Sequence, residues 1–177
     1  MKKLLFLLSV IALMGSTACN SDDSMDEIAS EAIITPQVGL GDITFQDDGN
    51  KVMEVYGMYN HLSANRNLSD AAFAMWYDIG LGFQLDYIDT QGLSLQEVAD
   101  MSSDLIDLNQ KIITIVVMSP FKAETKEGLG IGSSKEEIVA TYGEPDKVFS
   151  STEDYESLGL KFTYNAEDKV RRIDLYR

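Results

Sequence analysis

The stretch from Gly130 to Pro145 reads GIGSSKEEIVATYGEP and carries the signals of one short helix. Ser134, followed three residues later by Glu137, forms a capping box, in which each side chain satisfies a backbone N–H of the first turn. Gly143 suits the left-handed C-cap, and the proline that ends the stretch prevents the helix from continuing. We therefore predict a helix from about 135 to 142, with the serine before Ser134 as an alternative cap.

Two strands are predicted after this helix. In the segment 158–164, Leu, Leu, Phe and Tyr alternate with small or polar residues, which is the period of a half-buried strand. A polar turn at 165–169 leads to a second strand from Val170 to Tyr176, with the apolar residues again on one face. The unit is thus a helix packed on one side of an antiparallel hairpin.

The same pattern occurs earlier in the chain. Three blocks match in the same order: 43–57 with 129–143, 76–83 with 155–162, and Ile112, Ile115 and Val117 with Val170, Ile173 and Leu175. The first blocks both end in Tyr-Gly, and the second blocks share Gly-Leu-x-Phe. We therefore predict an internal repeat, with a first unit at 37–120 and a second at 121–177, and an α+β fold in which short helices pack on one face of an antiparallel sheet.

The first unit carries an insert at about 89–110. Apolar residues recur in it at roughly helical spacing, which predicts an extra helix, and an ordered acidic loop is the alternative. The strand that follows, Ile112–Met118, is apolar at nearly every position. This pattern predicts burial on both faces and a central place in the sheet.

The N-terminus has the features of an export signal. Two lysines precede an apolar run from Leu4 to Met14, and small residues lead to Cys19, the only cysteine. The run is about half the roughly 20 residues that a membrane span needs. The segment resembles a bacterial lipoprotein signal, which implies removal of residues 1–18 and a diacylglycerol thioether on the sulfur of Cys19. Ordinary secretion is the alternative, but it would leave an unpaired thiol in an oxidising compartment.

A polar, acidic tether is predicted at 19–36, because such a composition buries too little apolar surface to offset the entropy of ordering. The residues after Cys19 resemble the acidic signals that send some lipoproteins to the outer face of the outer membrane. We expect a lipid anchor in the outer membrane. The cell surface and the periplasmic face both remain open.

The charge balance excludes some partners. The chain has 14 Lys and Arg against 29 Asp and Glu, a formal net charge of -15. Such a surface repels phosphate backbones and anionic head groups, so we predict no nucleic-acid binding and no electrostatic membrane docking. The lipid on Cys19, and not charge, would hold the protein to the membrane.

Catalytic residues are not predicted. His61 is the only histidine, no thiol remains once Cys19 carries a lipid, and no nucleophile motif is present. The segment 47–50 offers carboxylate oxygens but lacks the spacing of a calcium loop, and calcium binding by the acidic insert is left open. We predict no enzyme, cofactor or metal. A hydrolase built on two carboxylates is the remaining alternative.

The motifs of the second unit suggest a family. The quoted stretch 130–145, then Tyr155, then GLKFTY at 159–164 and KVRRI at 169–173 resemble the repeat of the β-lactamase-inhibitor-protein-like superfamily. They are also similar to small outer-membrane assembly lipoproteins of the SmpA/OmlA type. The first unit departs from the pattern, since Gln46 stands where Gly132 does. The resemblance implies a fold used for protein binding rather than chemistry.

Strand alternation predicts which residues face away from the helices. The candidate partner-binding residues are Gln84, Asp86, Lys161, Thr163, Arg172 and Asp174. The resemblance implies that a partner docks on this face, and a solvated sheet face is the alternative. Tyr56 and Tyr142 are predicted to pack between helix and sheet, and Trp76 and Tyr155 at strand ends. We predict a lipid-anchored module that binds an envelope or extracellular protein, with a structural outer-membrane assembly lipoprotein as the alternative.

Overall fold

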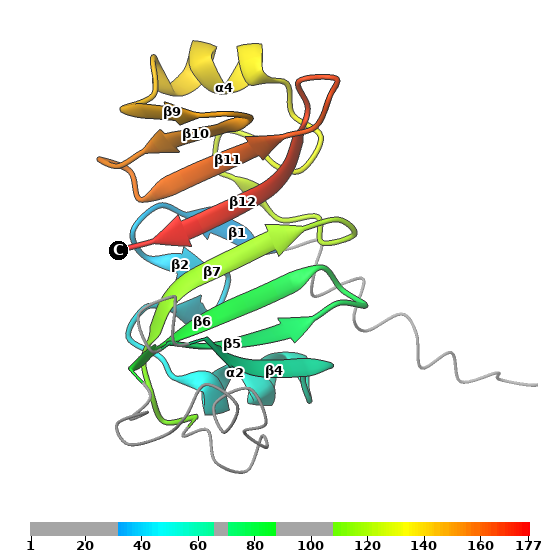
Figure 1. The fold of residues 1–177 in the computed structure, drawn as a ribbon, viewed down its shortest axis with the longest axis vertical. Helices are drawn as coiled ribbons and strands as arrows, with labels where there is room; N and C mark the ends of the chain where they lie inside the picture. The colour runs from blue at the N-terminus through cyan, green and yellow to red at the C-terminus, as the bar shows by residue number, and fades with distance from the viewer. Residues whose placement is uncertain (1–31, 66–70, 88–107) are drawn as a thin grey trace, which may run out of the picture.

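The computed structural model describes residues 32–65, 71–87 and 108–177, which form two β-sheets and two short helices (Figure 1). The elements, in chain order, are β1 (Ile33–Thr35), β2 (Gly39–Leu40), β3 (Ile43–Thr44), α2 (Gly49–Tyr56), β4 (His61–Asn65), β5 (Ala71–Trp76), β6 (Leu81–Tyr87), β7 (Ile112–Met118), β8 (Glu124–Thr125), α4 (Lys135–Tyr142), β9 (Lys147–Phe149), β10 (Thr152–Tyr155), β11 (Leu160–Tyr164) and β12 (Val170–Tyr176).

The large sheet has eight antiparallel strands in the order β4-β5-β6-β7-β12-β11-β10-β9. The first four strands come from the N-terminal part of the chain and the last four from the C-terminal part. We call these two groups the first half and the second half of the sheet. They meet where β7 pairs with β12, at the centre.

The register in which β7 pairs with β12 is related to the sequence match between these two strands. The ungapped match aligns Val116 with Asp174, and the two residues are also paired across the strands. On either side of this pair the register continues, for example from Val117 to Ile173. A residue of β7 and its counterpart in β12 therefore lie the same number of positions from the Val116–Asp174 pair. Outward from this pair, the strands β7-β6-β5-β4 of the first half correspond in order to β12-β11-β10-β9 of the second.

In each half, a glycine fixes the turn that leads into β6 or β11. Gly80 and Gly159 both have positive φ, 73° and 64°. A Cβ on Gly80 would lie 2.3 Å from the carbonyl oxygen of Met118, and one on Gly159 would lie 2.2 Å from that of Tyr176. Only glycine fits either position without moving the adjacent strand. The shared Gly-Leu-x-Phe block thus has a direct steric cause.

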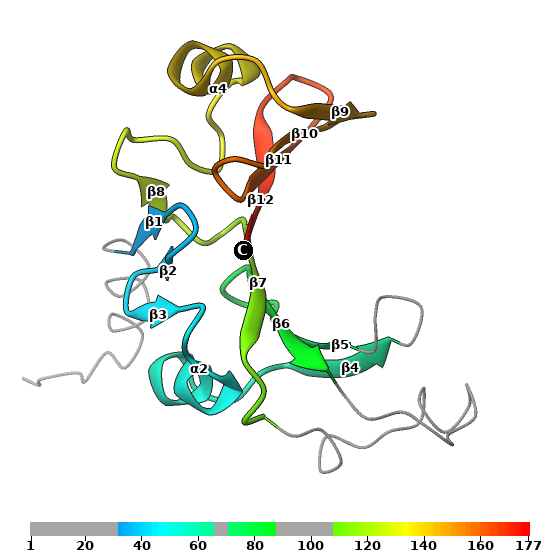
Figure 2. The same ribbon diagram turned by 90° about the vertical axis from the view of Figure 1, so that its left-hand side faces the viewer.

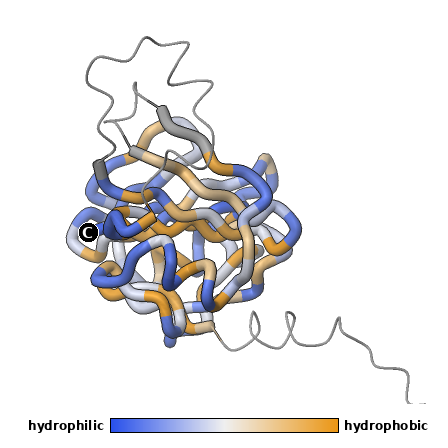
Figure 3. The backbone as a smooth tube through the Cα atoms, turned by 90° about the horizontal axis from the view of Figure 1, so that it is seen from below, coloured by the Kyte–Doolittle hydropathy of each residue, from blue (hydrophilic) through white to orange (hydrophobic). Residues whose placement is uncertain are grey.

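The small sheet joins the two parts of the chain. Its strands run β3-β2-β1-β8, and β1 pairs in parallel with β8. The side view places α2, the small sheet and α4 on one side of the large sheet (Figure 2). The apolar core lies between these layers and includes the fully buried Phe83, Phe121 and Phe162. Apolar segments accordingly run through the middle of the molecule (Figure 3).

Helix α4 begins and ends where its sequence signals predict. Ser134 and Glu137 form the capping box: the Ser134 N–H donates to Glu137 Oε2 at 2.6 Å, and the Glu137 N–H donates to Ser134 Oγ at 3.3 Å. The Gly143 N–H caps the other end by donating to the Val139 carbonyl. Helix α2 uses Asp48 instead, whose carboxylate accepts from the Lys51 N–H.

The aromatic residues at the strand ends pack as predicted. Trp76 and Tyr155 are buried, and both donate to the glycine carbonyl that ends the neighbouring helix. The Trp76 indole N–H reaches Gly57 at 3.1 Å, and the Tyr155 hydroxyl reaches Gly143 at 3.2 Å. Each helix is therefore tied to its half of the sheet by the same kind of bond. Burial raises the pKa of Tyr155 to about 12, so this hydroxyl stays protonated at neutral pH.

The prediction of an α+β fold built from repeated helices on a sheet is wrong. The described part of the chain is mostly β-strand, with two sheets and only two helices of eight residues each. All four strands of the small sheet have only two or three residues, and they are too short to produce a detectable period. The edge strand β9 is exposed at all three positions, so it shows no alternation either.

The predicted signal peptide, Cys19 and most of the insert lie outside the described residues. The end of the range predicted as a tether contains β1, where Ile34 is buried. Among the described segments, neither helix has the length and apolar character needed to cross a bilayer. The strand Ile112–Met118 is central, as predicted, and none of its residues is exposed.

Candidate functional site: the open face of the large sheet

One face of the large sheet is free of any element in the described part of the chain (Figures 1 and 2). We call it the open face. Strand alternation places on it the side chains that do not join the core. In the first half these include Phe73, Met75 and Gln84, and in the second half Asp154, Lys161, Thr163, Arg172, Asp174 and Tyr176.

A shallow hollow of about 260 Å³ lies across the centre of this face. It is bounded by side chains from β5, β6, β7, β12 and β11. They are Phe73, Gln84, Thr114, Val116, Lys161, Arg172, Asp174 and Tyr176. The hollow therefore spans the junction of the two halves. Its walls combine apolar, hydroxyl and charged groups.

The charges in the second half of the face are paired. Lys161 Nζ lies 3.2 Å from Asp154 Oδ2 and 5.4 Å from the centre of the Tyr176 ring. The Tyr176 hydroxyl donates to the same carboxylate. Burial and this acidic neighbour raise the pKa of Tyr176, so the hydroxyl remains a donor. These contacts hold three side chains in one arrangement.

Arg172 and Asp174 form a second pair, on β12. The Arg172 Nε lies 2.9 and 3.0 Å from the two carboxylate oxygens of Asp174. Asp174 is almost fully buried, whereas the Arg172 side chain is 42% exposed. The guanidinium therefore keeps donors that point to solvent while its position is fixed.

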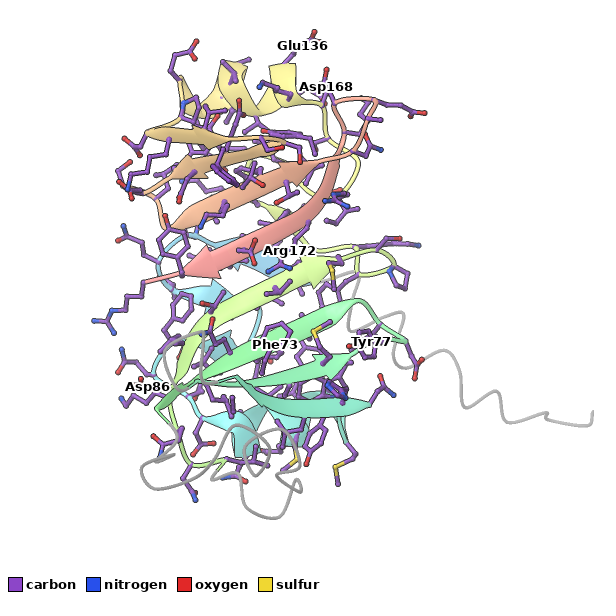
Figure 4. All side chains as sticks on the ribbon, in the orientation of Figure 1. Phe73, Tyr77, Asp86, Glu136, Asp168 and Arg172 are labelled. Carbon is purple, nitrogen blue, oxygen red and sulfur yellow. The ribbon has the colours of Figure 1, made fainter. Side chains whose placement is uncertain are left out.

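The first half of the face has apolar side chains at Phe73 and Met75, beside the polar Gln84 and Thr114. A Cβ on Gly82 would lie 2.5 Å from the Met75 sulfur and 3.0 Å from the Phe73 ring, so both side chains lie across this glycine. Tyr77 follows at the end of β5, 58% exposed, with its ring centre 6.3 Å from that of His61. Figure 4 shows Phe73 and Tyr77 on this half and Arg172 near the centre.

Four of the six predicted binding residues line the hollow: Gln84, Lys161, Arg172 and Asp174. Thr163 lies beside it and is nearly buried, with its hydroxyl 3.1 Å from that of Thr152. Asp86 is exposed at the end of β6, away from the hollow (Figure 4). Both are therefore poorer candidates for direct contact.

Sequence reasoning missed the other four lining residues, Phe73, Thr114, Val116 and Tyr176. Tyr176 lies two residues after Asp174, which was already assigned to this face, so extending the alternation would have found it. Val116 belongs to a strand that is apolar at nearly every position, which gives no alternation to extend. Phe73 required the β5–β6 register, in which it pairs with Gln84.

The carboxylates of the segment 47–50, which lack the spacing of a calcium loop, have structural roles. The Asp47 carboxylate accepts from the Thr44 N–H at 2.7 Å and from its hydroxyl at 2.8 Å, and Asp48 caps α2. Within the described ranges, no three acidic, histidine or cysteine side chains gather as a metal site would require. The insert that raised the question of calcium lies mainly outside these ranges.

Comparisons with protein-family models, curated proteins and solved structures find no match to this chain. The resemblances to β-lactamase-inhibitor-protein-like repeats and to lipoprotein signals therefore stay predictions from the sequence motifs. The open face and its residues are the structural basis of the function proposed below.

Proposed function

We propose that this chain is a lipid-anchored protein of the cell envelope that binds another protein through the open face, without catalysis. The observation that carries the proposal is the hollow at the centre of that face, which Arg172, Lys161 and Phe73 all line. Arginine and aromatic side chains at the centre of a surface are the residues that contribute most to protein interfaces.

Pre-arranged charges favour such a role. The Lys161–Asp154 and Arg172–Asp174 pairs already hold their side chains in place, so these side chains would lose little further rotamer entropy when a partner binds. Paired charges also give orientation and specificity to an interface, while the exposed Tyr77 and the partly exposed Phe73 supply aromatic area to bury. The face therefore combines an apolar contact with a fixed pattern of charge.

The lipid on Cys19 is the second part of the proposal. Cys19 precedes the first described residue, Ala32, by 13 positions, so an anchored chain would have a tether between the membrane and the sheet. Protease treatment of intact cells producing a tagged chain tests the side of the membrane, with Cys19→Ala as the control that cannot be lipidated. Release of the unaltered protein in soluble form would contradict the anchor.

A photo-crosslinking amino acid at position 84 tests the face itself. We expect a specific adduct from cells, and we expect Lys161→Ala with Arg172→Ala to reduce its yield by about tenfold or more, because centrally placed charged residues each contribute about 1 kcal/mol or more. Lys126→Ala, which alters a side chain 85% exposed outside this face, is the matched control. Equal yields from both variants, with unchanged thermal unfolding, would place binding elsewhere.

A further inference from the structure

The guanidinium of Arg172, at the centre of the open face (Figure 4), uses only one of its edges within the fold. Asp174 accepts hydrogen bonds from Nε and from Nη2, the two nitrogens of that edge. A guanidinium has five N–H donors, so both hydrogens of Nη1 and one of Nη2 are left over. These donors have no acceptor in the part of the chain that the structure describes. The second edge therefore has the geometry for a two-point contact with another carboxylate.

The cations of the open face are more exposed than the carboxylates that pair with them. The side chains of Lys161 and Arg172 are 38% and 42% exposed, whereas those of Asp154 and Asp174 are 16% and 11% exposed. A partner would therefore meet the ammonium and the guanidinium first, with the carboxylates beneath them. On a chain with a formal net charge of -15, this arrangement gives an acidic group a local site of approach.

The shared fold does not require the Arg172–Asp174 pair. The match that aligns Val116 with Asp174 also aligns Thr114 with Arg172, and all four residues line the hollow. These positions thus accept a hydroxyl and an apolar side chain in the first half. Burial of a carboxylate costs hydration, and replacing such a pair with apolar residues is often neutral or stabilising. Stability does not account for the pair, whereas orientation of Arg172 toward a ligand does.

The hollow beside Arg172 has room for a single side chain. Its volume of about 260 Å³ lies just below the range of small-molecule pockets. Phe73 and Val116 give it apolar walls, and Gln84 and Lys161 add further N–H donors. This set of groups suits a methylene stem that ends in a carboxylate.

We propose that the protein partner of the open face inserts a glutamate side chain into this hollow, an inference that rests on the proposed function. The carboxylate would accept from the free edge of Arg172, and the stem would lie against Phe73 and Val116. Charge complementarity selects this occupant. A basic side chain would be repelled by Arg172 and Lys161, and an apolar one would bury the free donors without an acceptor.

NMR on the full chain in detergent micelles tests the contact, at about 0.15 M salt so that diffuse charge effects are screened. The probes are Nα-acetyl-glutamate N-methylamide, the glutamine derivative of similar shape without the charge, and inorganic phosphate. We expect saturable shifts of the Arg172 Nε–H and of amides in β7, β11 and β12 with the glutamate probe. The glutamine probe should bind about fivefold more weakly or less. Tighter binding of phosphate than of the glutamate probe would overturn the proposal.

Two arginine variants make the test specific. Arg172→Lys keeps a positive charge beside Asp174 but lacks the planar second edge, so it should weaken binding of the glutamate probe about three- to tenfold. Arg171→Lys is the matched control, because Arg171 is exposed and does not line the hollow. It should bind the probe as the unaltered protein does. Thermal unfolding checks that both variants are folded, and equal affinities in the two would overturn the proposal.

The photo-crosslink from position 84 separates this proposal from the proposed function. An adduct of equal yield in Arg172→Lys and Arg171→Lys, with no binding of the glutamate probe, would overturn the glutamate contact and still support protein binding. Saturable binding of the probe without any adduct would support the carboxylate contact at Arg172 and contradict the protein partner.

Discussion

The two halves of the large sheet share their backbone contacts and differ in their side-chain chemistry. The register that pairs Trp76 with Leu81 in the first half pairs Tyr155 with Leu160 in the second. On the open face, however, Met75 and Gly82 of the first half correspond to Asp154 and Lys161 of the second. One half is apolar where the other carries an ion pair.

This difference indicates which residues maintain the fold and which are free to serve a function. Helix caps, the turn glycines and the aromatic residues bonded to them recur in both halves, because each satisfies or accommodates backbone groups. The outward positions need only to tolerate solvent or a partner. We therefore expect variants of the shared contacts to change stability alike in both halves, and variants of the outward positions to change binding.

The largest expected effect comes from the core phenylalanines at corresponding positions. Phe83 and Phe162 are fully buried, and each contacts the aromatic residue at its strand end and the tyrosine of its helix. Replacing either with alanine should lower the free energy of unfolding by about 3–5 kcal/mol, because a large cavity remains. Urea unfolding followed by circular dichroism measures both.

Phe149→Ala is the control for this pair, because Phe149 is 84% exposed and its loss should cost less than about 0.5 kcal/mol. We expect one transition in both core variants, since β7 and β12 join the halves and β1 pairs with β8 across them. A biphasic curve in which one half unfolds alone would break the comparison.

The parts of the fold that could be predicted are those with strong local signals. The capping box and Gly143 set the ends of α4, and the alternation in β11 and β12 came from long, half-buried strands. The small sheet could not be predicted, because its strands have only two or three residues and one of its pairings, β1 with β8, joins segments far apart in the chain. Such strands depend on tertiary contacts, and this is why the α+β prediction failed.

Removal of Glu153 is expected to have an intermediate effect. It probes the buried contacts of Glu153 with Lys135 and Tyr164, at a position where the first half has Ala74. Glu153→Ala leaves the buried Tyr164 hydroxyl without its acceptor and Lys135 without its partner, so we expect a loss of about 1–3 kcal/mol. Adding Tyr164→Phe removes the unsatisfied donor. The double variant should therefore lose less stability than the two single variants together.

Strict additivity in that cycle would mean that the hydrogen bond between Glu153 and Tyr164 contributes nothing, and the halves would then differ less than their sequences suggest. The same residues show the limit of sequence reasoning about sites. Glu153 was not singled out, because a glutamate in an alternating strand is expected to face solvent. Its burial becomes evident only when the pairing with Phe162 places it against α4.

The smallest expected effect concerns the difference between the N-terminal caps of α4 and α2. Hydrogen bonds from the backbone N–H and the hydroxyl of Ser134 lower the pKa of Glu137, whereas Lys51 occupies the same position in α2. A carboxyl group whose pKa is lower in the folded state stabilises the fold above its unfolded pKa, about 4.3, and loses that contribution as pH falls through the folded value. Glu137→Gln should therefore be less stable than the unaltered protein at pH 7, and the difference should shrink under acid.

Urea midpoints at neutral and acidic pH measure this difference. Glu136→Gln removes the same charge from the same turn without altering the box, so subtracting its pH profile isolates the hydrogen bonds made by Glu137. If the corrected difference stays constant with pH, the box contributes only through the uncharged groups of Ser134. In that case each helix would begin with a single capping side chain, the Ser134 hydroxyl in α4 and the Asp48 carboxylate in α2. The reciprocal glutamate of α4 would then add nothing to the difference between the two halves.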